Sequence, residues 1–167
     1  GTLIFNSTTS LMEYYSGNNW IPIDAPPTVT SVNNTNIKET EINAGFDIVV
    51  TGNSFKSGAS VRFIGNDGST FSSPTVAVNS ASQITARVPT TVTNAKEPFD
   101  VEVTNISGLS NRLDDAFNVN AKPIWSTNAG NLVTITDIAT GTHATVGATD
   151  PESDTITYSG TVGGGMS

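Results

Sequence analysis

The segment Phe99-Asp100-Val101-Glu102-Val103-Thr104 decides the fold, because apolar and polar side chains alternate along it without a break. Successive side chains of a β-strand point to opposite faces, so Phe99, Val101 and Val103 share one face. This pattern predicts an antiparallel strand that turns one face toward a core and the other toward water.

Similar segments lie on both sides of this one, separated by turn residues such as Gly65-Asn66-Asp67-Gly68. We expect strands at Thr28–Val32, Asp47–Gly52, Ser60–Ile64, Thr75–Asn79, Gln83–Val88, Phe99–Thr104 and Ala116–Val119. The side chains expected in the core are Val61, Phe63, Ile84, Ala86, Val88, Phe99, Val101 and Val103. About seven short strands in about 95 residues are typical of an immunoglobulin-like β-sandwich. The predicted fold class is all-β, and no segment has a helical period of useful length.

Two breaks divide the chain into residues 1–25, 26–120 and 121–167. Pro26-Pro27 interrupts any strand and stiffens the first junction. Residues 26–120 hold the predicted sandwich. Residues 121–167 are interpreted as an incomplete immunoglobulin-like domain with strands at Asn131–Ile135, His143–Ala148 and Thr155–Ser159.

Residues 1–25 predict a small β-meander with short strands near Thr2–Phe5, Leu11–Tyr15 and Trp20–Ile23. So small a sheet buries too little to be stable alone, so its large apolar side chains need a partner surface. Aromatic side chains are the usual anchors of such contacts. The residues predicted to anchor or oligomerise the chain are Phe5, Leu11, Tyr14, Tyr15 and Trp20. An alternative is that the tyrosines and Trp20 form a flat platform that binds carbohydrate.

The composition favours β structure and narrows the classes of partner. Charged residues make up only 13% of the chain, so the best surface helix formers are scarce. The net charge of −8 disfavours nucleic acid and anionic lipid as partners. The absence of cysteine excludes disulfides and thiolate zinc sites. No stretch approaches the roughly 18 apolar residues of a membrane span, so we expect no membrane insertion.

No arrangement of polar residues predicts an enzyme. His143 is the only histidine, which leaves no basis for a catalytic triad within this chain. The pairs Asp114-Asp115 and Glu39 with Glu41 would need a cleft to hydrolyse glycosides, and solvated loops are the simpler interpretation. We therefore expect no catalytic residue and no cofactor beyond the cation considered next.

Asp150, Glu152 and Asp154 alternate along a turn around Pro151. Closely spaced carboxylates supply the oxygen ligands that Ca²⁺ prefers, so a calcium site is one interpretation. The spacing and the glycine of an EF-hand are absent, and a plain acidic turn is the other interpretation.

Residues 26–120 resemble the IPT/TIG family of immunoglobulin-like domains. The resemblance is carried by the following segments, in order: Pro27–Val32, Gly45–Phe55, Lys56–Phe63, Ser82–Pro89, Val101–Asn105, Ser107–Asn111 and Phe117–Val119. Within them, Gly52 and Gly58 are expected at turns that need a positive φ, and Phe55 is expected to plug the core. The family implies a binding or spacer module without chemistry of its own.

The flanking segments resemble other modular proteins. Residues 1–23 resemble a short repeat of bacteriophage fibre and appendage proteins, through Gly1–Asn6, Leu11–Tyr15 and Asn19–Ile23. Residues 148–159 are similar to the start of a cadherin-like repeat, in which calcium binds between domains. Together these resemblances imply a virion structural protein on the particle exterior, in the form of a fibre, whisker or decoration subunit. They also imply a homo-oligomer, a trimer if fibre-like, in contact with other virion proteins. A module that binds a host glycan or receptor and a bacterial surface adhesin are the alternatives.

Overall fold

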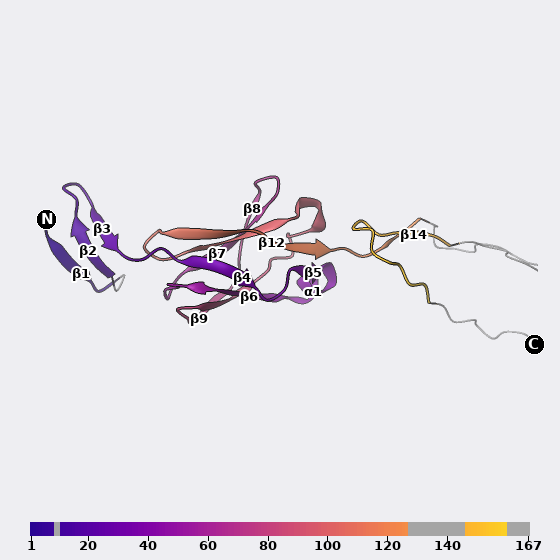
Figure 1. Ribbon diagram of the computed structural model, residues 1–167, viewed down its shortest axis with the longest axis horizontal. Coiled ribbons are helices and arrows are strands. Elements are labelled where there is room, and N and C mark those ends of the chain that lie inside the picture. Colours follow the sequence, from indigo (N-terminus) through magenta and orange to yellow (C-terminus); the bar gives the residue numbers. More distant parts are fainter. Residues whose placement is uncertain (9–10, 127–145, 160–167) are drawn as a thin grey trace, which may run out of the picture. The chain divides into compact units, whose positions relative to one another are not determined.

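A computed structural model describes residues 1–8, 11–126 and 146–159. The chain divides into two compact units, Gly1–Asn120 and Ala121–Ser167, and each is described by itself. The first unit holds a three-stranded sheet and a two-layer sandwich (Figure 1). The division of this first unit at residue 25 stays a prediction.

The sandwich consists of a four-stranded sheet and a five-stranded sheet. The first sheet has the order β4-β6-β10-β9, with β4 at Thr28–Val32, β6 at Asp47–Asn53, β10 at Gln83–Arg87 and β9 at Val76–Ser80. The second has the order β5-β12-β11-β7-β8, with β5 at Asn36–Lys38, β12 at Ser110–Asn120, β11 at Phe99–Thr104, β7 at Ser60–Gly65 and β8 at Thr70–Ser72. Only β5 and β12 pair in parallel within the sandwich. This order is that of an immunoglobulin-like sandwich, which confirms the predicted fold class.

The core lies between the two sheets and is built from the alternating residues. Each of the eight side chains expected there is at most 2% exposed. Phe99 stacks on Phe117 with ring centroids 5.4 Å apart, and Phe63 meets Phe117 edge-on at 5.8 Å. These contacts join strands β7, β11 and β12, so one aromatic cluster fixes the centre of the second sheet.

Five parts of the sandwich were not predicted. Strands β5 and β8 have three residues each, and β12 begins six residues before the expected Ala116. A short helix, α1 (Glu39–Ala44), and a 3₁₀ turn, η1 (Asn94–Lys96), also occur. Helix α1 buries only Ile42 and ends at Gly45, which has a φ of 96°. A helix this short shows no repeat in the sequence.

The roles expected for the glycines are half right. Gly58 has a φ of 81° and sits in the turn before β7, as predicted. Gly52 does not have a positive φ and lies inside β6. A Cβ at residue 52 would lie 1.8 Å from the carbonyl oxygen of Thr28 and 2.6 Å from the ring of Phe55. Gly52 is therefore needed for the close approach of β4 and for the buried Phe55 plug.

The amino-terminal sheet is the predicted meander. Its strands are β1 (Leu3–Asn6), β2 (Leu11–Tyr15) and β3 (Trp20–Ile23), paired antiparallel in the order β1-β2-β3. Gly17 has a φ of 106° in the turn between β2 and β3, where Ser16 donates its N–H to the carbonyl of Asn19.

The second unit shows two short strands in its described residues, β13 (Ile124–Trp125) and β14 (Ala148–Thr149), which pair antiparallel. The strand expected at Asn131–Ile135 and the first half of the one expected at His143–Ala148 lie outside the described residues. Residues 155–159 belong to no strand in the described part of the chain, so the strand predicted there is wrong. A strand needs a neighbour, and the sequence pattern could not supply one.

Candidate functional site

The meander places six apolar side chains on one face of its sheet. Directly opposite residues of antiparallel strands point to the same side. The register therefore aligns two rows across the three strands, Leu3-Tyr14-Ile21 and Phe5-Met12-Ile23. We call these residues the six-residue face. Each of them is between 37% and 63% exposed, and none carries a charge.

The opposite face of the meander is mixed in character. The rings of Tyr15 and Trp20 lie side by side, 5.2 Å apart and tilted by 50°, and both side chains are exposed. Glu13 is only 7% exposed, and its carboxylate accepts a hydrogen bond of 2.9 Å from the side-chain amide of Asn6. This face therefore combines a ring pair with a satisfied carboxylate, whereas the six-residue face is wholly apolar.

The five residues predicted as anchors fall on both faces. Phe5 and Tyr14 belong to the six-residue face, while Tyr15 and Trp20 lie on the other. Leu11 is in β2, but its side chain lies outside the described ones. The remaining members of the six-residue face are Leu3, Met12, Ile21 and Ile23. Choosing mainly aromatic residues missed these four, which are found only when alternation within each strand is combined with the pairing register between strands.

The segment after β3 is attached to the loops at one end of the sandwich. The side chain of Asp24 is only 4% exposed, and its carboxylate lies 3.6 Å from the ammonium of Lys56. Ser107 donates its hydroxyl to the same carboxylate at 3.2 Å. Nearby, the buried Asn105 side chain donates to the carbonyl of Ser54 and accepts from the backbone N–H of Lys56. These bonds order the residues that lead into the Pro26-Pro27 junction.

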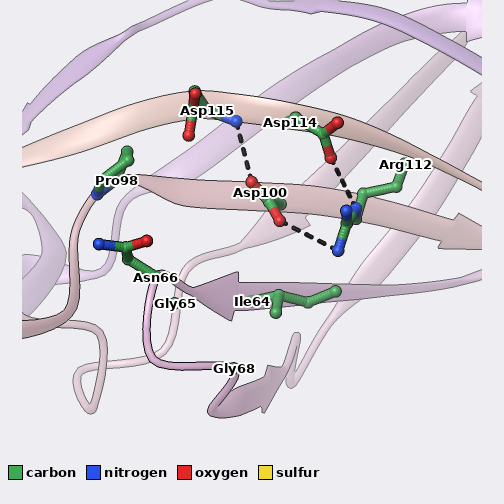
Figure 2. A pocket seen from close by; sticks show the side chains of 9 residues that line it. All are labelled: Ile64, Gly65, Asn66, Gly68, Pro98, Asp100, Arg112, Asp114 and Asp115. Atoms are coloured by element: carbon green, nitrogen blue, oxygen red, sulfur yellow. Dashed lines mark hydrogen bonds and ion pairs between the residues drawn. The ribbon is translucent and has the colours of Figure 1, made fainter.

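A shallow polar hollow on the sandwich is lined by three carboxylates (Figure 2). Its lining comes from the β7–β8 turn, the start of β11 and a bulge in β12: Ile64, Gly65, Asn66, Gly68, Pro98, Asp100, Arg112, Asp114 and Asp115. The bulge arises because Val101 pairs with Leu113 whereas Phe99 pairs with Phe117. Asp115 has a φ of 49° within it.

The charged side chains around this hollow pair with one another. Asp100 accepts a hydrogen bond of 2.9 Å from the backbone N–H of Asp115, which the bulge frees from the ladder. Arg112 forms ion pairs with Asp100 at 3.3 Å and with Asp114 at 2.7 Å (Figure 2). The arrangement stabilises the bulge, and it places no nucleophile beside a base.

Two exposed ion pairs shift the ionisation of sandwich carboxylates. A hydrogen bond from Arg87 holds the pKa of Asp47 below its ordinary value, and the same contact raises the pKa of Arg87. Hydrogen bonds from Lys96 and from Ser69 hold the pKa of Asp67 well below its ordinary value. Asp67 lies in the predicted Gly65–Gly68 turn, which does connect the antiparallel strands β7 and β8. The first pair joins the paired ends of β6 and β10, and the second joins η1 to the β7–β8 turn.

Two of the three acidic residues considered for calcium accept hydrogen bonds from backbone N–H groups. Asp150 accepts the backbone N–H groups of Glu152 and Asp154, each at 3.0 Å. Glu152 accepts the backbone N–H of Ala121 at 3.2 Å. Within residues 1–8, 11–126 and 146–159, no group of three or more acidic or histidine side chains is placed to hold a metal ion. The calcium site stays a prediction, and His143 lies outside the described residues.

Comparison with known proteins assigns this chain to no family. No protein-family model matches this chain, and no curated protein matches it. Among the helices that the structure describes, none is both long enough and apolar enough to cross a membrane.

Proposed function

We propose that this chain is a structural subunit of a bacteriophage particle, in a fibre, whisker or decoration protein on the particle exterior. The sandwich, of IPT/TIG type, acts as a rigid spacer, and the meander anchors or oligomerises the chain. The mechanism is mechanical and adhesive, without a reaction. The proposal draws its phage context from the resemblance of residues 1–23 to fibre and appendage repeats.

The observation that carries this proposal is the contrast in burial between the meander and the sandwich. The sandwich encloses its own core, while the meander leaves most of its large apolar side chains exposed. Exposed apolar surface on this scale indicates a site of interaction with another protein. The contacts of Asp24 and the Pro26-Pro27 junction support a spacer role, because they limit the conformations of the segment that links the meander to the sandwich.

A second candidate function is recognition of a host glycan by the Tyr15–Trp20 ring pair. Exposed aromatic rings stack on the apolar faces of sugars, and these two lie beside each other on one face of the meander. A glycan array probed with the chain tests this function. Binding that disappears in Trp20→Ala would favour it over a purely structural role.

The proposed function is tested on phage particles grown on their host. Antibodies raised against residues 26–120 are applied to purified particles and located by immuno-electron microscopy. Label at fibres, whiskers or the capsid surface is the expected result. Absence of the chain from particles, confirmed by mass spectrometry of their proteins, would refute the proposal.

A further inference from the structure

The six-residue face has no covering layer within the residues that the structure describes. Its least exposed member, Ile21, is still 37% exposed, and its most exposed, Phe5, reaches 63%. An isolated three-stranded sheet is stable only when such a face packs on something. The main structural question about the meander is therefore which surface covers this face.

The area of the face suits a small but stable interface. Six large apolar residues, each about half exposed, present on the order of 600 Å². Two such faces packed together bury about 1,200 Å² in total, which is where specific, stable protein interfaces begin. A face of this size can support an oligomer without help from the sandwich.

The shape of the face permits it to pack on itself. Strand β2 supplies a middle column, Tyr14 and Met12, which is flanked by Leu3 and Phe5 on one side. Strand β3 supplies the other side, Ile21 and Ile23. A twofold axis in the plane between two such faces sets apolar columns against apolar columns, whether it runs along the strands or across them. A self-complementary patch of this kind is what a symmetric interface requires.

The charge distribution also favours packing of this face on a second copy. The full chain carries a net charge of −8, so copies of it repel one another in general. Glu13 is the only charged side chain between residues 1 and 23, and it lies on the opposite face of the sheet. The six-residue face is therefore a neutral apolar patch on an acidic chain. It offers no cation for nucleic acid and only one hydroxyl, that of Tyr14, for a glycan.

We infer that the six-residue face packs against the same face of a second copy of this chain. The inference rests on the proposed function and specifies its interface: Met12 and Tyr14 lie at the centre, and Leu3, Phe5, Ile21 and Ile23 surround them. A face that packs on the same face of a second copy closes around a twofold axis, so the expected mass in solution is that of two chains.

Sedimentation velocity on the full chain tests the inference, using a variant in the middle column. Met12→Glu places a carboxylate where the partner offers no cation, so the dissociation constant rises about 100-fold or more. Ile106→Glu is the matched control, because Ile106 is 48% exposed in a sandwich loop and Met12 is 43% exposed. The control retains the oligomer, and circular dichroism shows that both variants stay folded.

Crosslinking gives an independent reading, because the chain has no cysteine of its own. Met12→Cys treated with a short bismaleimide yields covalent dimers, since the middle columns of the two copies face each other. Ile106→Cys under the same treatment stays mostly monomeric.

Three outcomes would overturn the inference. The chain could sediment as a monomer at all concentrations, the oligomer could survive Met12→Glu, or Ile106→Cys could crosslink as well as Met12→Cys. If the chain is monomeric yet immuno-electron microscopy locates it on particles, the face is covered by another virion protein. In that case the inference fails and the proposed function stands.

Discussion

The meander and the sandwich are made from the same local pattern and differ in what covers it. Both consist of short antiparallel strands with alternating side chains, and both contain apolar rows across neighbouring strands. In the sandwich, a second sheet from the same chain covers these rows, and Phe99 is fully buried. In the meander no second sheet is described, and Phe5 is 63% exposed. Alternation thus defines an apolar face, and chain topology decides whether that face becomes a core or an interface.

The largest effect that should separate the two regions comes from removing one phenylalanine ring from each. Phe99→Ala leaves a cavity beside Phe117 and Phe71, so the free energy of unfolding should fall by about 3–5 kcal/mol. Phe5→Ala removes an exposed ring, so unfolding of the sandwich should change by no more than about 0.5 kcal/mol.

Urea denaturation of both variants at low protein concentration checks this pair. The unfolding of the sandwich can be followed by far-ultraviolet circular dichroism, and wild type provides the reference midpoint. Equal losses of stability in the two variants would mean that Phe5 belongs to the folding core of the first unit. The distinction between a buried core in the sandwich and an interface in the meander would then be wrong.

A second loss of stability, about as large as the lower end of the first, is expected at Gly52, where β4 lies close to the backbone of β6. Gly52→Ala forces a Cβ into the carbonyl of Thr28 and the ring of Phe55, so unfolding should become easier by about 3 kcal/mol. Gly68→Ala is the matched control. Residue 68 has a φ of 78° but no atom within 4 Å of an added Cβ. Backbone strain alone should therefore cost it about 1 kcal/mol.

Thermal unfolding of these two glycine variants gives the comparison directly. A loss in Gly68→Ala that equals or exceeds the loss in Gly52→Ala would show that contact with β4 is not what requires glycine at residue 52. The meander offers a further reference in Gly17, which also has a positive φ and no atom near an added Cβ.

The sequence predicted those elements whose signal is local. Strands β6, β10 and β11 alternate over five or more residues and β7 over its first four, and the side chains assigned to the core are buried. The first half of β12 was missed because it is almost wholly polar, with Leu113 alone pointing inward. It is a strand only because β11 lies beside it. The need for Gly52 also depends on a neighbour distant in sequence, Thr28, and no periodicity reports it.

The candidate site was predicted only in part, because some of its features are local in the sequence and others depend on neighbouring strands. The sequence indicated that residues 1–25 need a partner, because so small a meander cannot bury its own apolar side chains. It did not indicate which side chains act together, because that depends on the pairing register between strands. Alternation along β2 separates Tyr14 from Tyr15. The register then places Tyr14 between Leu3 and Ile21 in one apolar row.

The smallest effect that we predict is a response of the sandwich to acid. The hydrogen bonds from Lys96 and Ser69 lower the pKa of Asp67 in the folded chain from its ordinary value of 3.8. A group whose pKa is lower when folded contributes stability above its unfolded pKa and loses that contribution as the pH falls toward its folded pKa. The contribution of Asp67 should therefore be fully present at neutral pH and decline progressively as the pH falls below about 3.8. Because the pair is exposed, solvent and salt screen it and the contribution is small.

Urea midpoints measured between pH 6 and pH 2 should show this contribution as a difference between wild type and Asp67→Asn. The two should differ most at neutral pH and converge in acid, and 0.5 M salt should shrink the difference. A carbon-detected NMR titration of Asp67 provides the direct control, with its pKa expected to rise toward the ordinary value in Lys96→Gln. The meander contains no such ion pair among its described side chains, so its self-association should respond little to the same change of pH. If association weakened in parallel with the loss of the Asp67 contribution, the sandwich would take part in the contact between copies. The six-residue face would then be only one portion of that interface.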